Sequence, residues 1–179
     1  PGNAAINITG WTLISTSLNV TLSGSIPAGG FFLLESDDNS TISDISADQI
    51  YASAAPLSDG GEVITLSNNL GYFIDTASNE NGGSWPKGTK SPNFATMERT
   101  GTTVEKDSSW ITNNGVTRNG KNANGSAIYG TPKKSNSRVI APTPTRFVIA
   151  TPTATLIPPV GRPIISEILA RPGFDWNQD

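Results

Sequence analysis

The stretch GEVITLSNNLGYFIDTAS, residues 61–78, carries the clearest structural signal in the chain. In its first half Ile64 and Leu66 alternate with other residues, with the period of two that is typical of a strand with one buried face. Residues 68–71, Asn-Asn-Leu-Gly, supply side chains that tolerate a positive φ in a tight turn. Residues 72–78 then return as a second strand. The stretch therefore predicts a β-hairpin whose apolar face is mainly Ile64 and Leu66.

Further short strands are predicted on both sides of this hairpin. Residues 11–24 mix β-branched residues with Ser and Asn at intervals near two, and residues 31–36, FFLLES, predict a fully buried strand. Residues 96–101 and 109–114 predict two more strands. No window of the sequence has the apolar spacing of a helix. Short strands with turn signals roughly every 8–12 residues favour an all-β protein, built as an antiparallel β-sandwich.

Composition and charge exclude several classes of function. The 179 residues include 12 Lys and Arg against 15 Asp and Glu, a net charge of -3, so the basic patch that nucleic-acid binding needs is not expected. The chain contains no Cys and no His, which excludes disulfides, a Cys nucleophile, a Ser-His-Asp triad and a Cys/His zinc site. No apolar stretch approaches the roughly 20 residues that span a bilayer.

Composition divides the chain into three parts. Residues 1–138 are rich in Ser, Thr, Asn and Gly and carry the predicted strands, whereas residues 139–161 are rich in Pro and Thr. Proline removes backbone donors and favours an extended, stiff chain, so we interpret residues 139–161 as a linker. A long irregular loop within one domain is the alternative, and residues 146–150, RFVIA, could dock there as a short edge strand. Residues 162–179 return to an apolar run and an acidic loop.

Eight segments of the first part resemble, in order, the lamin tail domain, an immunoglobulin-like β-sandwich that is also common in bacterial surface proteins. The resemblance covers about 130 residues and implies the same fold, in an extracellular or cell-surface setting. The segments are GWTL (10–13), IPAGGFFLLES (26–36), LSDGGEVITL (57–66), LGYFID (70–75), SWPKG (84–88), ATMERT (95–100), SSWIT (108–112) and YGTPKKSNS (129–137).

The resemblance departs from the family at the beginning of the chain. Members of the family open with an apolar strand and an acidic loop before the Gly-Trp segment, whereas here a similar opening, PIISEILARPGFDWNQD, stands at residues 163–179. We interpret this order as most of one repeat, a linker and the start of a following repeat. A sandwich that lacks one strand has an unpaired edge, so we expect residues 163–169 to insert there, with Ile165 and Ile168 facing the core. The segment could complete its own domain or, by strand swapping, a second copy of the chain.

Tryptophan side chains are the candidates for ligand contact. Trp11, Trp85 and Trp110 could form a platform for carbohydrate, but the burial energy of aromatic side chains favours Trp11 and Trp110 as core residues. Trp85 and the nearby Lys87 are the best exposed candidates for ligand binding. The alternative for Trp85, beside Pro86, is that it caps a loop.

Acidic residues provide one further candidate site and a set of predicted turns. Asp175, Asn177 and Asp179 have the spacing of the first oxygen ligands of a calcium loop, which makes calcium a candidate cofactor of the intact protein, against the alternative of a solvated acidic turn. Asp37, Asp38, Asn39, Asp44 and Asp48 are predicted to be exposed turn formers.

Glycoside hydrolysis would need two carboxyl groups roughly 5–9.5 Å apart across a cleft. Glu35, Glu62, Asp75 and Glu98 lie on or near predicted strands, and we expect them at the surface, where they would contribute to solubility.

The sequence therefore favours a non-catalytic module of a modular surface or secreted protein, acting in adhesion, targeting or spacing through protein or glycan contacts. A calcium-dependent carbohydrate-binding module is the second hypothesis, and an enzyme is the third. No nucleic-acid partner and no membrane span are expected.

Overall fold

The computed structural model describes residues 2–52, 57–137 and 163–168 of the chain. Strands make up 26% and helix 4%, which confirms the prediction of an all-β fold. The helical residues form two short 3-10 turns, η1 (Glu80–Gly83) and η2 (Asp107–Ser109). The predicted linker, residues 139–161, and most of residues 162–179 lie outside the described residues.

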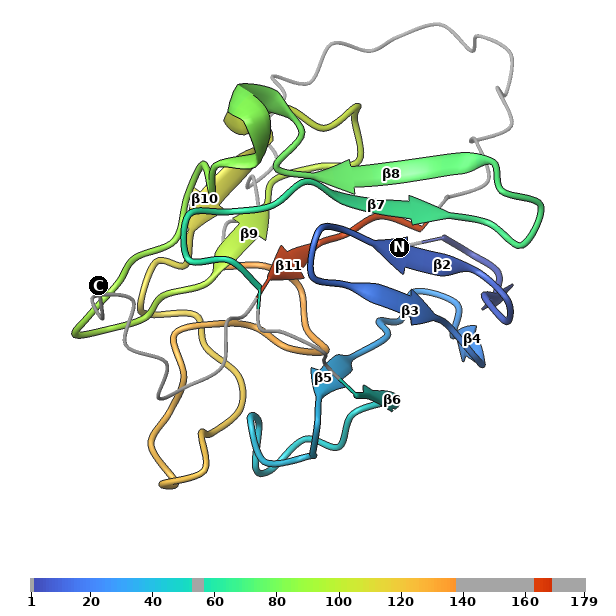
Figure 1. The fold of residues 1–179 in the computed structure, drawn as a ribbon. Coiled ribbons are helices and arrows are strands. Elements are labelled where there is room, and N and C mark those ends of the chain that lie inside the picture. The colour runs from blue at the N-terminus through green and yellow to red at the C-terminus, as the bar shows by residue number, and fades with distance from the viewer. Residues whose placement is uncertain (1, 53–56, 138–162, 169–179) are drawn as a thin grey trace, which may run out of the picture.

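The larger sheet has four antiparallel strands in the order β3-β2-β7-β8 (Figure 1). The predicted hairpin forms its centre and one edge, with β7 (Ile64–Ser67) pairing β8 (Phe73–Ala77). The stretch 11–24 supplies the other two strands, β2 (Thr12–Ile14) and β3 (Asn19–Thr21). Ile64 and Leu66 are buried, as their alternation predicts.

The second sheet has three antiparallel strands in the order β10-β9-β11. The two strands predicted from residues 96–101 and 109–114 are β9 (Met97–Arg99) and β10 (Trp110–Thr112), and they pair with each other. The third strand, β11 (Glu167–Ile168), comes from the C-terminal segment and pairs with the other edge of β9. The segment thus completes a sheet of its own chain, and Figure 1 shows it, in red, beside β9.

Two short strand pairs flank these sheets. β1 (Ile6–Asn7) pairs antiparallel with β4 (Ser25–Ile26), and β5 (Leu34–Ser36) pairs in parallel with β6 (Gln49–Tyr51). The prediction of a fully buried strand over residues 31–36 is wrong. Only the last three of these residues are in a strand, and the one that is buried is Glu35, because the β5–β6 pair lies outside the two main sheets and leaves its apolar residues half exposed.

The core lies between the two sheets, which pack in a sandwich-like arrangement. It joins buried side chains of the four-stranded sheet with Met97 and Trp110 of the three-stranded sheet. Ile165 and Ile168 of the C-terminal segment pack against this core. The expectation that these two isoleucines face the core is therefore confirmed, and apolar burial contributes to holding the segment in place.

Candidate functional site

The four carboxylates that the sequence suggested were surface groups are all buried. Glu35, Glu62, Asp75 and Glu98 have exposed fractions of 4%, 6%, 1% and 0%. The expectation of a solubility role is therefore wrong. Burial of a charged group is unfavourable unless it is paired or hydrogen-bonded, so the partners of these groups indicate what they do.

Glu62 joins two loops to the start of β7. Its Oε2 accepts hydrogen bonds from the Ser15 hydroxyl (2.6 Å) and from the amide and hydroxyl of Ser17 (both 2.9 Å), and its Oε1 accepts one from the Ser58 amide (2.6 Å). Burial alone would raise the pKa of Glu62, but these hydrogen bonds outweigh it and lower the pKa.

Asp75 and Arg99 form an ion pair that connects the two sheets. Asp75 lies on β8 and Arg99 on β9, and the guanidinium reaches the carboxylate with one contact of 2.7 Å and a second of 3.3 Å. The same guanidinium stacks on the ring of Trp110, 5.5 Å from its centroid. Asp75 Oδ2 also accepts a hydrogen bond from the Ile165 amide (3.0 Å), so the C-terminal segment binds directly to this pair.

Glu98 lies on the opposite face of β9, because neighbouring residues of a strand point to opposite faces. Its carboxylate accepts hydrogen bonds from the Asn113 amide group, the Thr131 hydroxyl and the backbone amide of Ser137, each 2.8 Å long. All of these partners are donors, as an ionised carboxylate requires. Glu98 therefore fixes residues 131–137 against the sheet.

Glu167 of the C-terminal segment stands opposite Glu98 in the β9–β11 pair. Its Oε1 accepts a hydrogen bond from the Thr131 amide (2.8 Å), and its Oε2 lies 3.5 Å from the Thr131 hydroxyl. Burial raises the pKa of Glu167 to about 7, and the nearby Glu98 adds to the increase. Gly130 leaves the space for this side chain, because a Cβ there would lie 2.7 Å from Glu167 Oε1.

The backbone of the segment is held by β9 and by Asn136. The Ser166 carbonyl accepts hydrogen bonds from the Arg99 amide and from the Asn136 side chain, both 2.7 Å long. The Asn136 amide group also donates to the Arg99 carbonyl (2.8 Å), so it bridges β9 and the segment.

We refer to the groups that bind residues 163–168 as the docking site, and it is the candidate functional site of this chain. The sequence alone does not predict most of it, although the TPKKSN stretch of residues 131–136 belongs to the segments that resemble the lamin tail domain. The docking site consists of Asp75, Arg99, Thr131 and Asn136, which hydrogen-bond to the segment, and Glu98, which is the strand partner of Glu167.

An apolar cavity of about 110 Å³ adjoins the docked segment. Pro163 and Ile164 contribute to its lining, together with Trp11 and Phe32 from the N-terminal part of the chain. The first residues of the segment are therefore packed less closely than Ile165 and Ile168, which contact the core.

Besides Glu62, two buried acids lie outside the docking site. Glu105 accepts hydrogen bonds from the indole N–H of Trp110 (2.7 Å), the hydroxyl of Thr76 (3.2 Å) and the amide of Asn79 (3.2 Å), and thus orients a core tryptophan. Burial raises the pKa of Glu35 on β5, against the lowering effect of the Ile42 amide.

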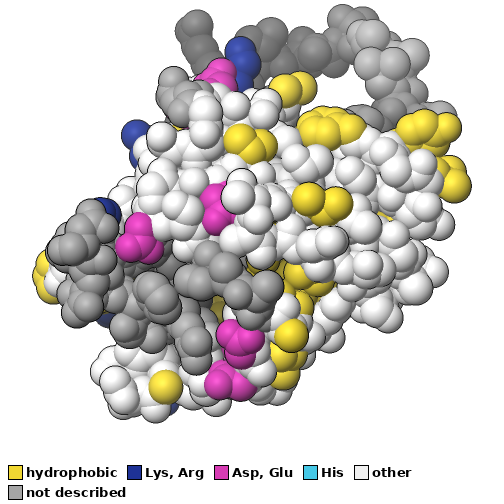
Figure 2. All heavy atoms as spheres, viewed as in Figure 1, with side chains coloured by type: hydrophobic (Ala, Val, Ile, Leu, Met, Phe, Trp, Pro, Cys, Tyr) yellow, Lys and Arg dark blue, Asp and Glu magenta, His cyan; other side chains and the backbone are white. Residues whose placement is uncertain are grey.

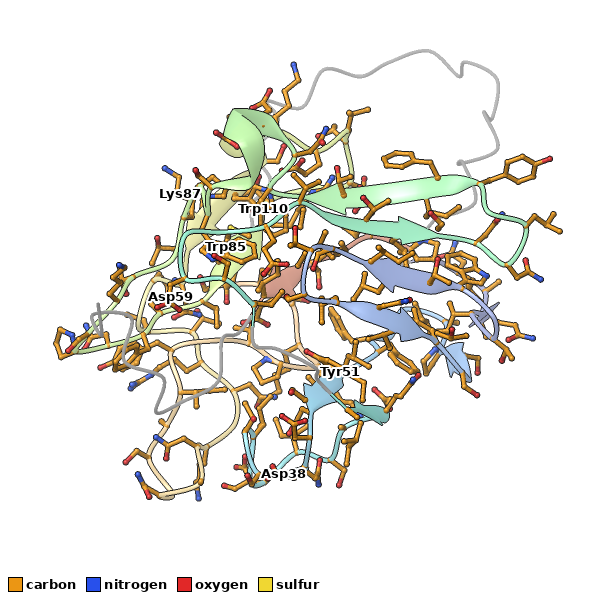
Figure 3. All side chains as sticks on the ribbon, in the orientation of Figure 1. Asp38, Tyr51, Asp59, Trp85, Lys87 and Trp110 are labelled. Atoms are coloured by element: carbon orange, nitrogen blue, oxygen red, sulfur yellow. The ribbon has the colours of Figure 1, made fainter. Side chains whose placement is uncertain are left out.

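The tryptophans do not form a common platform. Trp110 is 1% exposed, which confirms its prediction as a core residue, and Trp11 is half-buried against the core. Trp85 also packs against the core, partly exposed, and its indole N–H donates to the Ser58 carbonyl (2.9 Å), so it caps a loop. Lys87 is exposed, and Figure 3 shows it at the rim of the molecule, far from Asp38.

The acidic turn residues 37, 38, 39, 44 and 48 are exposed, as predicted. Asp175, Asn177 and Asp179 lie outside the described residues. Within residues 2–52, 57–137 and 163–168, no three acidic side chains come together in a way that could hold a metal ion.

No helix in the described part of the chain has the length and apolar character to cross a membrane.

Comparison with known proteins gives no relative: no protein-family model, no curated protein and no solved structure matches this chain.

Proposed function

We propose that this chain is a non-catalytic β-sandwich module that is closed by its own C-terminal segment and acts in adhesion, targeting or spacing. The observation that carries the proposal is the pairing of β11 with β9, reinforced by hydrogen bonds to the segment from Asp75, Thr131 and Asn136. Such a docking site holds a strand in place and turns two sheets and a distant segment into one unit.

The roles of the buried acids support a structural function. Asp75, Glu98 and Glu167 bind backbone amides or a guanidinium of their own chain, and Glu62 and Glu105 hold loops and a tryptophan in the same way. Catalytic carboxylates must instead face a substrate across a cleft.

The composition of the outer surface also favours a role in contacting other molecules rather than in catalysis. Figure 2 shows a face on which the described charged side chains are few, in keeping with a chain that carries only 15% charged residues. A surface of Ser, Thr and Asn offers hydrogen bonds to proteins or glycans without long-range electrostatic attraction. The resemblance to the lamin tail domain supports placing the module in a surface or secreted protein of several repeats.

Two truncated chains test the closure of the sandwich. A chain that ends at residue 162 lacks β11, whereas a chain that ends at residue 168 keeps it and serves as the matched control. We expect the shorter chain to melt at a clearly lower temperature, because it loses the burial of Ile165 and Ile168 and leaves Asp75 without its backbone donor. Equal melting temperatures for both chains would contradict the proposal.

The kind of contact is tested separately with a glycan array, run on the full chain with and without calcium. Calcium-dependent glycan binding that is lost in Trp85→Ala would favour a carbohydrate-binding module over adhesion through protein. Release of products from an oligosaccharide would contradict a non-catalytic role.

A further inference from the structure

Two carboxyl groups face each other where the C-terminal segment meets β9. Glu167 and Glu98 are Cα partners in the antiparallel pair, so their side chains leave the sheet on the same face. Both reach the hydroxyl of Thr131, at 2.8 Å for Glu98 Oε1 and 3.5 Å for Glu167 Oε2. Residues 130–137 pack against both groups, and Glu98 is fully buried whereas Glu167 is partly buried.

The Thr131 hydroxyl has a single proton and cannot donate it to both carboxyl groups. Glu98 is the nearer partner and receives it, since its other contacts, from Asn113 and Ser137, are also with donors. Glu167 Oε2 can then hydrogen-bond to the same hydroxyl only if Glu167 is protonated and donates to the Thr131 oxygen. The geometry of the docked segment therefore fits one ionised and one protonated carboxyl group.

The cation nearest to this pair in sequence does not neutralise it. Arg99 follows Glu98 on β9 and points to the other face, where its guanidinium binds Asp75 of β8. The charged side chains of the packed elements are Glu98 and Arg99 on β9, Asp75 on β8, and Lys133 and Lys134 in residues 130–137. Lys133 binds Asp48 and Lys134 is exposed, and among the described residues no cation is hydrogen-bonded to Glu167. Like charges on directly opposed strand residues are unfavourable.

We propose that residues 163–168 form a pH-sensitive latch, held firmly while Glu167 carries a proton and loosened when both opposed carboxyl groups are ionised. The inference rests on the proposed function, because it assumes that the segment closes the sandwich in solution. Nothing in it depends on the partner that the module contacts.

The direction and size of the effect follow from linkage. The pKa of Glu167 is about 7 in the docked segment and has its ordinary value of 4.5 when the segment is released. The docked state then binds more protons than the released state, so docking is strongest below pH 4.5 and weakens as the pH rises to about 7. Between pH 5 and pH 8 the docking equilibrium should fall roughly 70-fold.

Amide hydrogen exchange of the full chain measures the latch directly. The Ile165 amide donates to Asp75 and the Arg99 amide donates to the Ser166 carbonyl, so both are protected only while the segment is docked. We expect their protection factors, corrected for intrinsic exchange, to fall by roughly the same 70-fold between pH 5 and pH 8. In Glu167→Gln the fall should disappear, because the amide keeps the hydrogen bond from Thr131 and does not titrate.

Glu80→Gln is the matched control variant, because Glu80 is exposed and accepts a hydrogen bond from the Asp107 amide away from the segment. It should keep the pH dependence of the unmodified chain. A carbon NMR titration of the Glu167 carboxyl group gives a second measurement that needs no variant. We expect a midpoint near 7, and a midpoint at the ordinary value would overturn the proposal.

The exchange experiment separates this inference from the proposed function. Strong protection that does not change with pH, or a fall that Glu167→Gln retains, would overturn the latch but leave the sandwich closed by β11. A lack of protection of the Ile165 amide at every pH would overturn both.

Discussion

Asp75 is the residue at which the three parts of the sandwich meet. It comes from the four-stranded sheet, binds Arg99 of the three-stranded sheet and accepts the Ile165 amide of the C-terminal segment. A buried ion pair of this kind is not in itself a strong source of stability, because desolvation offsets much of the attraction. Removing one member is costly, however, since it leaves the other charge buried without a partner.

Replacing Arg99 by methionine tests this argument. Arg99→Met keeps an apolar side chain near Trp110 but removes the cation from Asp75, so the free energy of unfolding should fall by about 3–5 kcal/mol. Urea unfolding followed by tryptophan fluorescence measures it. Lys133→Gln breaks the exposed pair with Asp48, which is 2.8 Å long, and as a control it should cost at most about 1 kcal/mol. Similar losses in the two variants would contradict a special role for the buried pair.

The sequence contains part of the signal that these acids are buried. Glu62 stands two residues before Ile64 and four before Leu66, so alternation places it on the core face with them. Asp75 stands directly opposite Leu66 in the hairpin, so it follows once the register of the hairpin is known. What the sequence could not provide is the partner of each acid, because Ser15, Arg99 and Thr131 reach them from distant parts of the chain.

At the scale of elements, the hairpin and the pairing of β9 with β10 followed from local patterns, but the contacts between loops did not. The clearest example is Gly61, which has a φ of 106° and where a Cβ would lie 2.1 Å from the Gly83 carbonyl oxygen and 2.6 Å from the Trp85 amide nitrogen. The loop before β7 and the loop after η1 approach each other so closely that there is no space for a side chain. This contact also brings Trp85 to the Ser58 carbonyl.

Gly61→Ala should therefore be among the most damaging small substitutions in the chain. Its Cβ would collide with the Gly83 carbonyl oxygen, which is backbone and cannot move aside easily, so we expect a loss above about 3 kcal/mol in the free energy of unfolding. Gly71→Ala is the control, since its φ is also positive, at 79°, but nothing lies within 4 Å of its Cβ. That variant should cost only about 1–2 kcal/mol, from backbone strain alone. Both free energies of unfolding are measured by urea unfolding. Equal losses in the two variants would show that the positive φ, and not the contact between the loops, causes the destabilisation.

At the scale of the whole molecule, the buried acids respond to pH in opposite directions. The pKa of Glu62 is lowered in the folded chain, so its contribution to stability is present above its ordinary pKa and is lost as the pH falls. Glu167 and Glu35 have raised pKa values, so the stability linked to them is present in acid and is lost as the pH rises, through about 7 for Glu167.

These opposing effects predict a maximum of the melting temperature near the ordinary carboxyl pKa, at about pH 4–4.5. Calorimetry or circular dichroism between pH 3 and pH 9 measures it. Glu62→Gln should flatten the acid side of the curve, and Glu167→Gln should flatten the side toward neutral pH. A melting temperature that rises steadily up to pH 8 would contradict the assignment of the raised pKa values to folded-state burial.

The pairing of β11 with β9 also sets an order of events during synthesis. Translation proceeds from the N-terminus, so residues 2–137 leave the ribosome before residues 163–168 do. Until then β9 is an edge strand of the nascent chain, with Asp75 and Glu98 already in place but without the segment that they bind. Shortening the stretch between residues 137 and 163 would shorten this interval, and with it the time during which chaperones or neighbouring nascent chains can reach the open edge.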